Sequence, residues 1–92
     1  MRATTKVAII GAGPAGLLLG HLLRAEGIDC LILERQTRAH VESRIRAGVL
    51  ETVTTDLLHR LGIDAGLNAH GLKEEGFNLA DGDRIIRIDL AR

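Results

Sequence analysis

Three glycines near the amino terminus stand at the spacing of a phosphate-binding turn. The segment Gly11-Ala12-Gly13-Pro14-Ala15-Gly16 follows an uncharged apolar run and opens an apolar helical pattern. In a strand–turn–helix unit the first glycine allows a sharp turn, the second lets backbone approach a pyrophosphate, and the third lets the helix pack closely on the sheet. The start of a helix also offers free N–H groups to an anion. The segment therefore predicts a dinucleotide site at Gly11, Gly13, Pro14, Ala15 and Gly16.

An acidic residue, Glu34, ends the next apolar run, at the roughly 20-residue spacing that dinucleotide sites show. A carboxylate there accepts hydrogen bonds from ribose hydroxyls and repels a 2′-phosphate. Glu34 thus disfavours NADP in this pocket and leaves both FAD and NAD open. A surface ion pair with Arg35 is the alternative role for Glu34.

A basic segment follows over residues 35–46. Guanidinium groups suit phosphate oxygens, and an extended backbone would place Arg44 and Arg46 on one side. A solvated loop is the alternative. The charged residues of the segment, with His40 beside them, are Arg35, Arg38, Glu42, Arg44 and Arg46.

The elements that must position these residues follow from periodicity and turn signals. Continuous apolar runs predict parallel strands covered on both faces, with Leu17 among the inward positions of the helix between them. The sequence predicts an α/β fold: a Rossmann-like β–α–β unit, then a helix, then a β-hairpin, forming an incomplete part of a larger FAD/NAD(P)-binding fold. The ranges are a strand at Val7–Ile10, a helix over residues 14–26 stopped by Gly27, a strand over 28–34, a helix over 50–61 stopped by Gly62, a short helix or irregular turn over 63–70, and a hairpin of 77–80 and 84–89 around Asp81-Gly82-Asp83.

Composition excludes several other classes of protein. The 92 residues carry 12 basic and 12 acidic side chains, which disfavours nucleic acid and anionic membranes as partners. The apolar stretch at residues 7–23 is too short and too rich in glycine for a membrane span. With Cys30 alone there is no internal disulfide, and the four histidines lack metal-site spacing, so we expect no metal and a cytoplasmic location.

The chain resembles the flavin-dependent aromatic hydroxylases. The similarity runs from about Lys6 to Leu90 and rests on the glycine segment, on Leu33-Glu34-Arg35-Gln36, and above all on Arg44-Ile45-Arg46-Ala47-Gly48-Val49-Leu50-Glu51. His40 stands where a tyrosine is familiar in that family, and Ala15 where a serine is common.

The resemblance implies a set of cofactor roles. The glycine segment would hold the ADP half of FAD, with Glu34 on its ribose. The FAD site would also be lined by Arg44, Ile45, Arg46, Ala47, Gly48 and Val49, with Arg46 near the phosphates. NADPH, or NADH given His40, would be the reductant, with its adenosine end near Arg35, Gln36 and His40.

The resemblance also implies an activity for the intact enzyme. A phenolic acid, 4-hydroxybenzoate, would be hydroxylated to 3,4-dihydroxybenzoate by a homodimer. Residues 1–92 would form the amino-terminal portion of the FAD-binding domain, without catalytic residues and without activity alone. Two alternatives remain: a non-catalytic nucleotide-binding or interaction module, and the cofactor domain of an NAD-dependent dehydrogenase.

Overall fold

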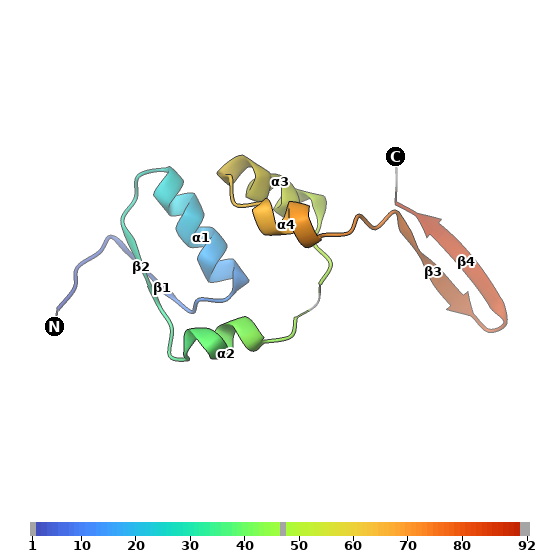
Figure 1. Cartoon of the computed structure of the whole chain (residues 1–92), viewed down its shortest axis with the longest axis horizontal. Helices are drawn as coiled ribbons and strands as arrows, with labels where there is room; N and C mark the ends of the chain where they lie inside the picture. Colours follow the sequence, from blue (N-terminus) through green and yellow to red (C-terminus); the bar gives the residue numbers. More distant parts are fainter. Residues whose placement is uncertain (1, 47, 91–92) are drawn as a thin grey trace.

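The chain opens with a parallel β–α–β unit, continues through short helices and ends in a hairpin (Figure 1). The computed structural model describes residues 2–46 and 48–90. The α/β class and the β–α–β start predicted from the sequence are confirmed. The elements in order are β1 (Val7–Ile10), α1 (Pro14–Ala25), β2 (Cys30–Leu33), α2 (Arg38–Ser43), α3 (Thr52–Leu61), α4 (Ala65–His70), β3 (Gly76–Asp81) and β4 (Arg84–Asp89).

Local signals at both ends of α1 explain its limits. Pro14 occupies the first turn, where its missing N–H has no intrahelical partner to lose. At the other end Gly27 takes φ +70°, and the N–H groups of Gly27 and Ile28 donate to the carbonyls of Arg24 and Leu23. This is the Schellman arrangement that ends a helix at a glycine.

Helix α1 packs on one face of the β1–β2 pair. The strands pair in register, Val7 with Cys30 through Ile10 with Leu33. Ile9 is the buried apolar side chain on the covered face, with 7% of its surface exposed. Gly20 of α1 is buried against this face. A Cβ at Gly20 would lie only 2.9 Å from Cδ1 of Ile32, so the absence of a side chain allows the close approach.

The opposite face of this sheet is open, which corrects two expectations. Ile10 and Leu33 are 81% and 53% exposed, so the strands are not covered on both faces. Leu17 is 44% exposed rather than inward, because it borders the open hollow between α1 and β2 instead of packing in a closed core. Apolar periodicity gives the type of an element, whereas burial depends on which segments pack against it.

Residues 35–46 contain a short helix, α2, that the sequence pattern did not predict. Thr37 caps α2, since its Oγ1 accepts a hydrogen bond from the His40 N–H at 3.1 Å. Arg38, the first residue of α2, donates from Nε to Glu42 Oε1 at 2.7 Å. The cap and this i,i+4 ion pair both favour a helix here.

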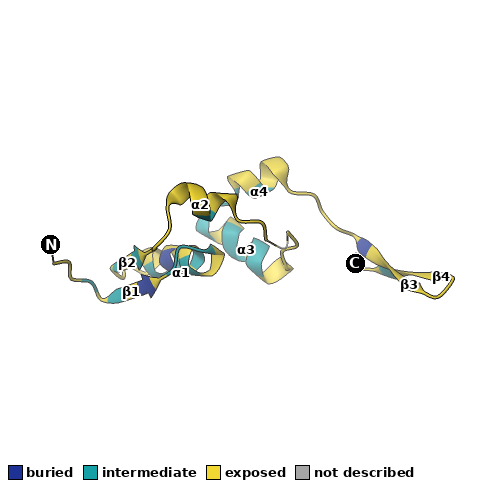
Figure 2. Cartoon of the chain, turned by 90° about the horizontal axis from the view of Figure 1, so that it is seen from below, coloured by how far each residue is buried: buried dark blue, intermediate teal, exposed yellow. Residues whose placement is uncertain are grey.

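The hairpin stands apart from the other elements (Figure 1, Figure 2). Strands β3 and β4 pair antiparallel, and the two residues between them are Gly82 and Asp83. Of these two residues, Gly82 has positive φ and Asp83 does not, which fits a type II′ turn. The radius of gyration is 17.9 Å, against roughly 12 Å for a compact chain of this length.

Within the ranges that the structure describes, no helix combines the length and the apolar character needed to cross a membrane. Gly16 and Gly20, the small residues of α1, allow the helix to pack closely on the strands.

The link between α3 and α4 is held by Asp64. Its Oδ2 accepts from His59 Nδ1 and, at 3.1 Å, from Asn68 Nδ2. The His59 hydrogen bond first, and the Asn68 hydrogen bond second, lower the pKa of Asp64 below the ordinary value of 3.8. A carboxylate with a lowered pKa stabilises the fold above its unfolded-state pKa, and this stabilisation is lost as pH falls through the folded-state value.

We predict that His59→Ala raises the Asp64 pKa toward 3.8, because the larger of its two hydrogen bonds is removed. Carbon-detected NMR titration of the Asp64 carboxyl group measures this directly. Asn68→Ala is the control and should give a smaller rise. An unchanged Asp64 midpoint in His59→Ala would contradict the assignment.

Candidate nucleotide-binding site

The glycine turn joins β1 to α1 and is tied to the end of β2. Gly11 has φ +109°, a conformation that L side chains rarely adopt. Its N–H donates to the carbonyl of Leu33 at 2.7 Å and so continues the parallel ladder by one residue. The chain then turns sharply into α1.

Gly16 sets how closely α1 approaches this turn. A Cβ at Gly16 would overlap the carbonyl oxygen of Gly11 and lie 3.2 Å from Cγ2 of Ile9. The Gly11 carbonyl is part of the backbone, so it cannot move aside as the end of a flexible side chain could. The third glycine of the motif is therefore required by helix–strand packing within the chain itself.

The second glycine, Gly13, has no such requirement within the chain. It caps α1 with extended backbone and makes no side-chain cap hydrogen bond. A Cβ there would meet only Nη2 of Arg46, at an ordinary 3.6 Å. The described contacts of the chain therefore leave room for a Cβ at Gly13 and do not themselves require a glycine there.

The start of α1 is also electrostatically suited to an anion. No acidic residue lies in its first turn. The first N–H groups of any α-helix lack intrahelical acceptors, and because Pro14 has none, those of Ala15 and Gly16 remain. These dipoles and the positive end of the helix favour negative charge.

Arg46 follows α2 in the sequence, and its guanidinium group lies near Gly13. The close approach of its guanidinium to Gly13 brings together two positions that the sequence separates by more than 30 residues. Arg44 has extended backbone at the end of α2. Ile45 and Val49 are largely exposed, and a Cβ at Gly48 would meet no atom within 4 Å. The predicted site residue Ala47 lies outside the described residues.

Glu34 faces the same turn from the end of β2. Its Oε1 accepts from the Ala12 N–H at 3.0 Å, and its Oε2 accepts from the Gln36 N–H at 2.8 Å. These two hydrogen bonds, and then the charge of Arg35, lower the pKa of Glu34 from its ordinary range. The carboxylate thus remains ionised at neutral pH, and it is held by backbone rather than by a surface ion pair.

The three residues expected near the reductant follow in the connection to α2. Arg35 and Gln36 lie directly after Glu34, and His40 lies in the first turn of α2. All three are exposed. Among the described residues, no side chain of these three makes a hydrogen bond to the glycine turn. The backbone N–H of Gln36 donates to Glu34, which in turn accepts from that turn.

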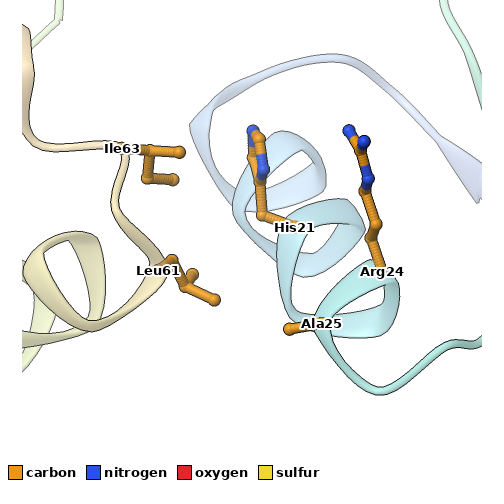
Figure 3. A pocket seen from close by; sticks show the side chains of 5 residues that line it. All are labelled: His21, Arg24, Ala25, Leu61 and Ile63. Atoms are coloured by element: carbon orange, nitrogen blue, oxygen red, sulfur yellow. The ribbon is translucent and has the colours of Figure 1, made fainter.

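The surface hollows lie elsewhere on α1. One of about 370 Å³, between α1 and the end of α3, is lined by His21, Arg24, Ala25, Leu61 and Ile63 (Figure 3). A second of about 480 Å³ follows α1 and β2. Neither includes the glycine turn, where the open backbone, the helix start and Glu34 provide the chemistry. Among the described residues, no group of three or more His, Cys, Asp or Glu side chains is placed to hold a metal ion.

Sequence reasoning missed two contributors to this region. The N–H of Ala12 as a partner of Glu34 has no sequence signal, because the contact depends on how the turn meets the end of β2. The cap at Thr37 did have a sequence signal, because threonine is a preferred N-cap residue. Its Oγ1 accepts a hydrogen bond from the N–H of His40, three residues later.

The family model described as an FAD binding domain matches residues 4–92. The chain is 49% identical over 87 residues to p-hydroxybenzoate hydroxylase of Acinetobacter baylyi, covering 95% of this chain and 22% of that protein. It is 36% identical over 89 residues to 3-amino-4-hydroxybenzoate 2-monooxygenase of Streptomyces cremeus, covering 92% of this chain and 22% of that protein. The chain is 30% identical over 89 residues to a probable NADH-specific resorcinol 4-hydroxylase of Rhodococcus jostii, covering 97% of this chain and 16% of that protein.

The chain belongs to the family of FAD-binding domains found in flavin-dependent aromatic hydroxylases. The membership expected from its motifs is confirmed, and the family's cofactor is FAD, the choice that Glu34 alone left open. The chain spans about a fifth of the length of the Acinetobacter and Streptomyces relatives, 22% of each.

We predict opposite tolerance at two glycines of the turn. Gly16→Ala should lower the free energy of unfolding by more than 2 kcal/mol, roughly the scale of an overpacked core, because its Cβ meets backbone. Gly13→Ala should change it by less than about 0.5 kcal/mol. Urea unfolding followed by circular dichroism measures both.

Gly66→Ala in α4 is the matched control, because a Cβ there meets nothing within 4 Å. Replacing a helical glycine in open space should stabilise the chain by up to about 1 kcal/mol. Equal effects of Gly13→Ala and Gly16→Ala would contradict this account of the turn.

Proposed function

We propose that the glycine turn, Glu34 and Arg46 form the binding surface for the ADP half of FAD. The observation that carries this proposal is the placement of the Arg46 guanidinium beside Gly13, at a helix start with free N–H groups. Two sources of positive charge then meet at one open backbone segment. A pyrophosphate is the part of FAD that such a surface suits.

Each residue has its own task in this proposal. Gly11 and Gly16 fix the path of the turn, Gly13 keeps the approach open, and the N–H groups of Ala15 and Gly16 face phosphate oxygens. Glu34 accepts from the adenosine ribose with the lone pairs that its backbone hydrogen bonds leave free. The remaining FAD residues in the proposal are Pro14, Arg44, Ile45, Ala47, Gly48 and Val49.

We propose that the complete enzyme is an NAD(P)H-dependent monooxygenase of a phenolic acid, with 4-hydroxybenzoate converted to 3,4-dihydroxybenzoate. Support comes from the Acinetobacter and Streptomyces relatives described above, whose names both specify a hydroxybenzoate as substrate. FAD supplies the redox chemistry when bound, and the residues of this chain supply position and electrostatics for its ADP half. We further propose a cytoplasmic homodimer, for which sedimentation of the complete enzyme is the test.

We predict that the chain binds ADP and FAD but binds FMN at least about tenfold more weakly, because FMN lacks the ADP half. Arg46→Ala should weaken ADP binding about tenfold, or ~1.4 kcal/mol, the scale of one charge-assisted hydrogen bond. Isothermal titration calorimetry measures these affinities. Arg84→Ala, on the separate hairpin, is the matched control and should bind as the unchanged chain does. Equal affinity for FMN and ADP would refute the proposal.

For the reductant we propose Arg35, Gln36 and His40 as contacts of its adenosine end. All three are exposed and adjacent to the Glu34 turn, and a positive side chain outside the FAD pocket can attract a 2′-phosphate. Arg35→Ala should therefore weaken binding of adenosine 2′,5′-bisphosphate severalfold and leave ADP affinity unchanged. An equal loss for both ligands would contradict a separate reductant contact.

A further inference from the structure

The carboxylate of Glu34 links two segments that lie far apart in the sequence. One oxygen accepts from the N–H of Ala12, which lies 22 residues earlier in the middle of the glycine turn. The other accepts from Gln36, two residues later, where the chain leaves β2. Glu34 therefore bridges the glycine turn and the start of the connection to α2.

This bridge acts on the most adaptable part of the site. Gly11 has φ +109° and Gly13 carries no side chain, so the turn loses much backbone freedom when it becomes ordered. Ala12 is the residue between these glycines. A hydrogen bond from its N–H to a charged acceptor is stronger than one to a neutral acceptor and restrains the turn directly.

We propose that Glu34 is a positioning residue, which holds the glycine turn in the shape that receives a pyrophosphate before any nucleotide is bound. This role is additional to a contact with ribose. It rests on the proposed function for the identity of the ligand, and it rests on the two hydrogen bonds of Glu34 for the mechanism. Affinity then depends on a carboxylate at position 34 even for a ligand without a ribose.

The bridge also has a defined pH dependence. The Ala12 and Gln36 N–H groups lower the pKa of Glu34, so the bridge is complete at neutral pH and is lost as pH falls through that lowered value. Arg35 is the charged neighbour that acts on this carboxylate, and Arg46 lies at the same turn beside Gly13. Residues 7–20, which form β1, the turn and most of α1, contain no titratable side chain.

The first test follows amide chemical shifts of the nucleotide-free chain during an acid titration by NMR. The Ala12 amide should shift with a midpoint below 4.5, together with the amide of Gln36. Gln36 is close in sequence and would respond even in an unfolded chain, whereas Ala12 responds only if the bridge exists. The Ala12 titration should vanish in Glu34→Gln and persist in Asp64→Asn, a matched change at another carboxylate of lowered pKa. An Ala12 amide that does not titrate in the unchanged chain would overturn the proposal without any variant.

The second test uses inorganic pyrophosphate, which has no ribose. If Glu34 contacted only ribose, Glu34→Gln would remove a repelling charge and strengthen pyrophosphate binding. A positioning role predicts the opposite sign, a loss of about threefold to tenfold for pyrophosphate and for ADP. Tighter pyrophosphate binding by Glu34→Gln would overturn the proposal. If neither ADP nor pyrophosphate binds the unchanged chain, the proposed function fails, and the Ala12 titration alone decides whether the bridge exists.

Discussion

The close approach of α1 to the end of β1 is the contact on which the rest of the site depends. It brings Gly16 against the Gly11 carbonyl, at a distance that any Cβ would prevent. Because this contact fixes where α1 begins, it also fixes where the free N–H groups of Ala15 and Gly16 lie relative to the strand ends. Gly20 extends the same close packing one turn further, over Ile9 and Ile32.

Electrostatics is arranged around that contact. The helix start is positive and has no side-chain cap, Arg46 lies beside it, and Glu34 accepts a hydrogen bond from the preceding turn at the end of β2. Opposite charges therefore act on neighbouring parts of one turn. This separation suits a ligand that carries a pyrophosphate at one end and a ribose diol at the other, as the ADP half of FAD does.

Local sequence signals predicted much of this architecture, and packing determined the remainder. Pro14 and Gly27 mark the limits of α1 through backbone rules that involve only a few neighbouring residues. The inward or outward position of Leu17 and Ile10 depends on which segments cover each face, and periodicity does not contain that information. The hairpin was predicted from the turn signal Asp81-Gly82-Asp83, and the pairing of Asp81 with Arg84 makes Gly82 and Asp83 its two turn residues.

The same division holds for the site. The glycines and Glu34 were identified by type and spacing, because the chemistry of a dinucleotide demands those residues. The hydrogen bond between Ala12 and Glu34 was not identified, since a backbone N–H has no sequence signature. Arg46 was one of several phosphate candidates by residue type, the family resemblance singled it out, and its side chain lies near Gly13 in the structure.

The central claim is that the glycine turn, Glu34 and Arg46 act as one nucleotide-binding surface. Amide chemical-shift mapping during addition of ADP tests it most directly, because every described element is observed at once. We expect the shift changes to concentrate at residues 11–16, at 34–36 and at Arg46, with β3 and β4 unaffected. Changes centred instead on the hollow beside His21 and Arg24, with a silent glycine turn, would contradict the account.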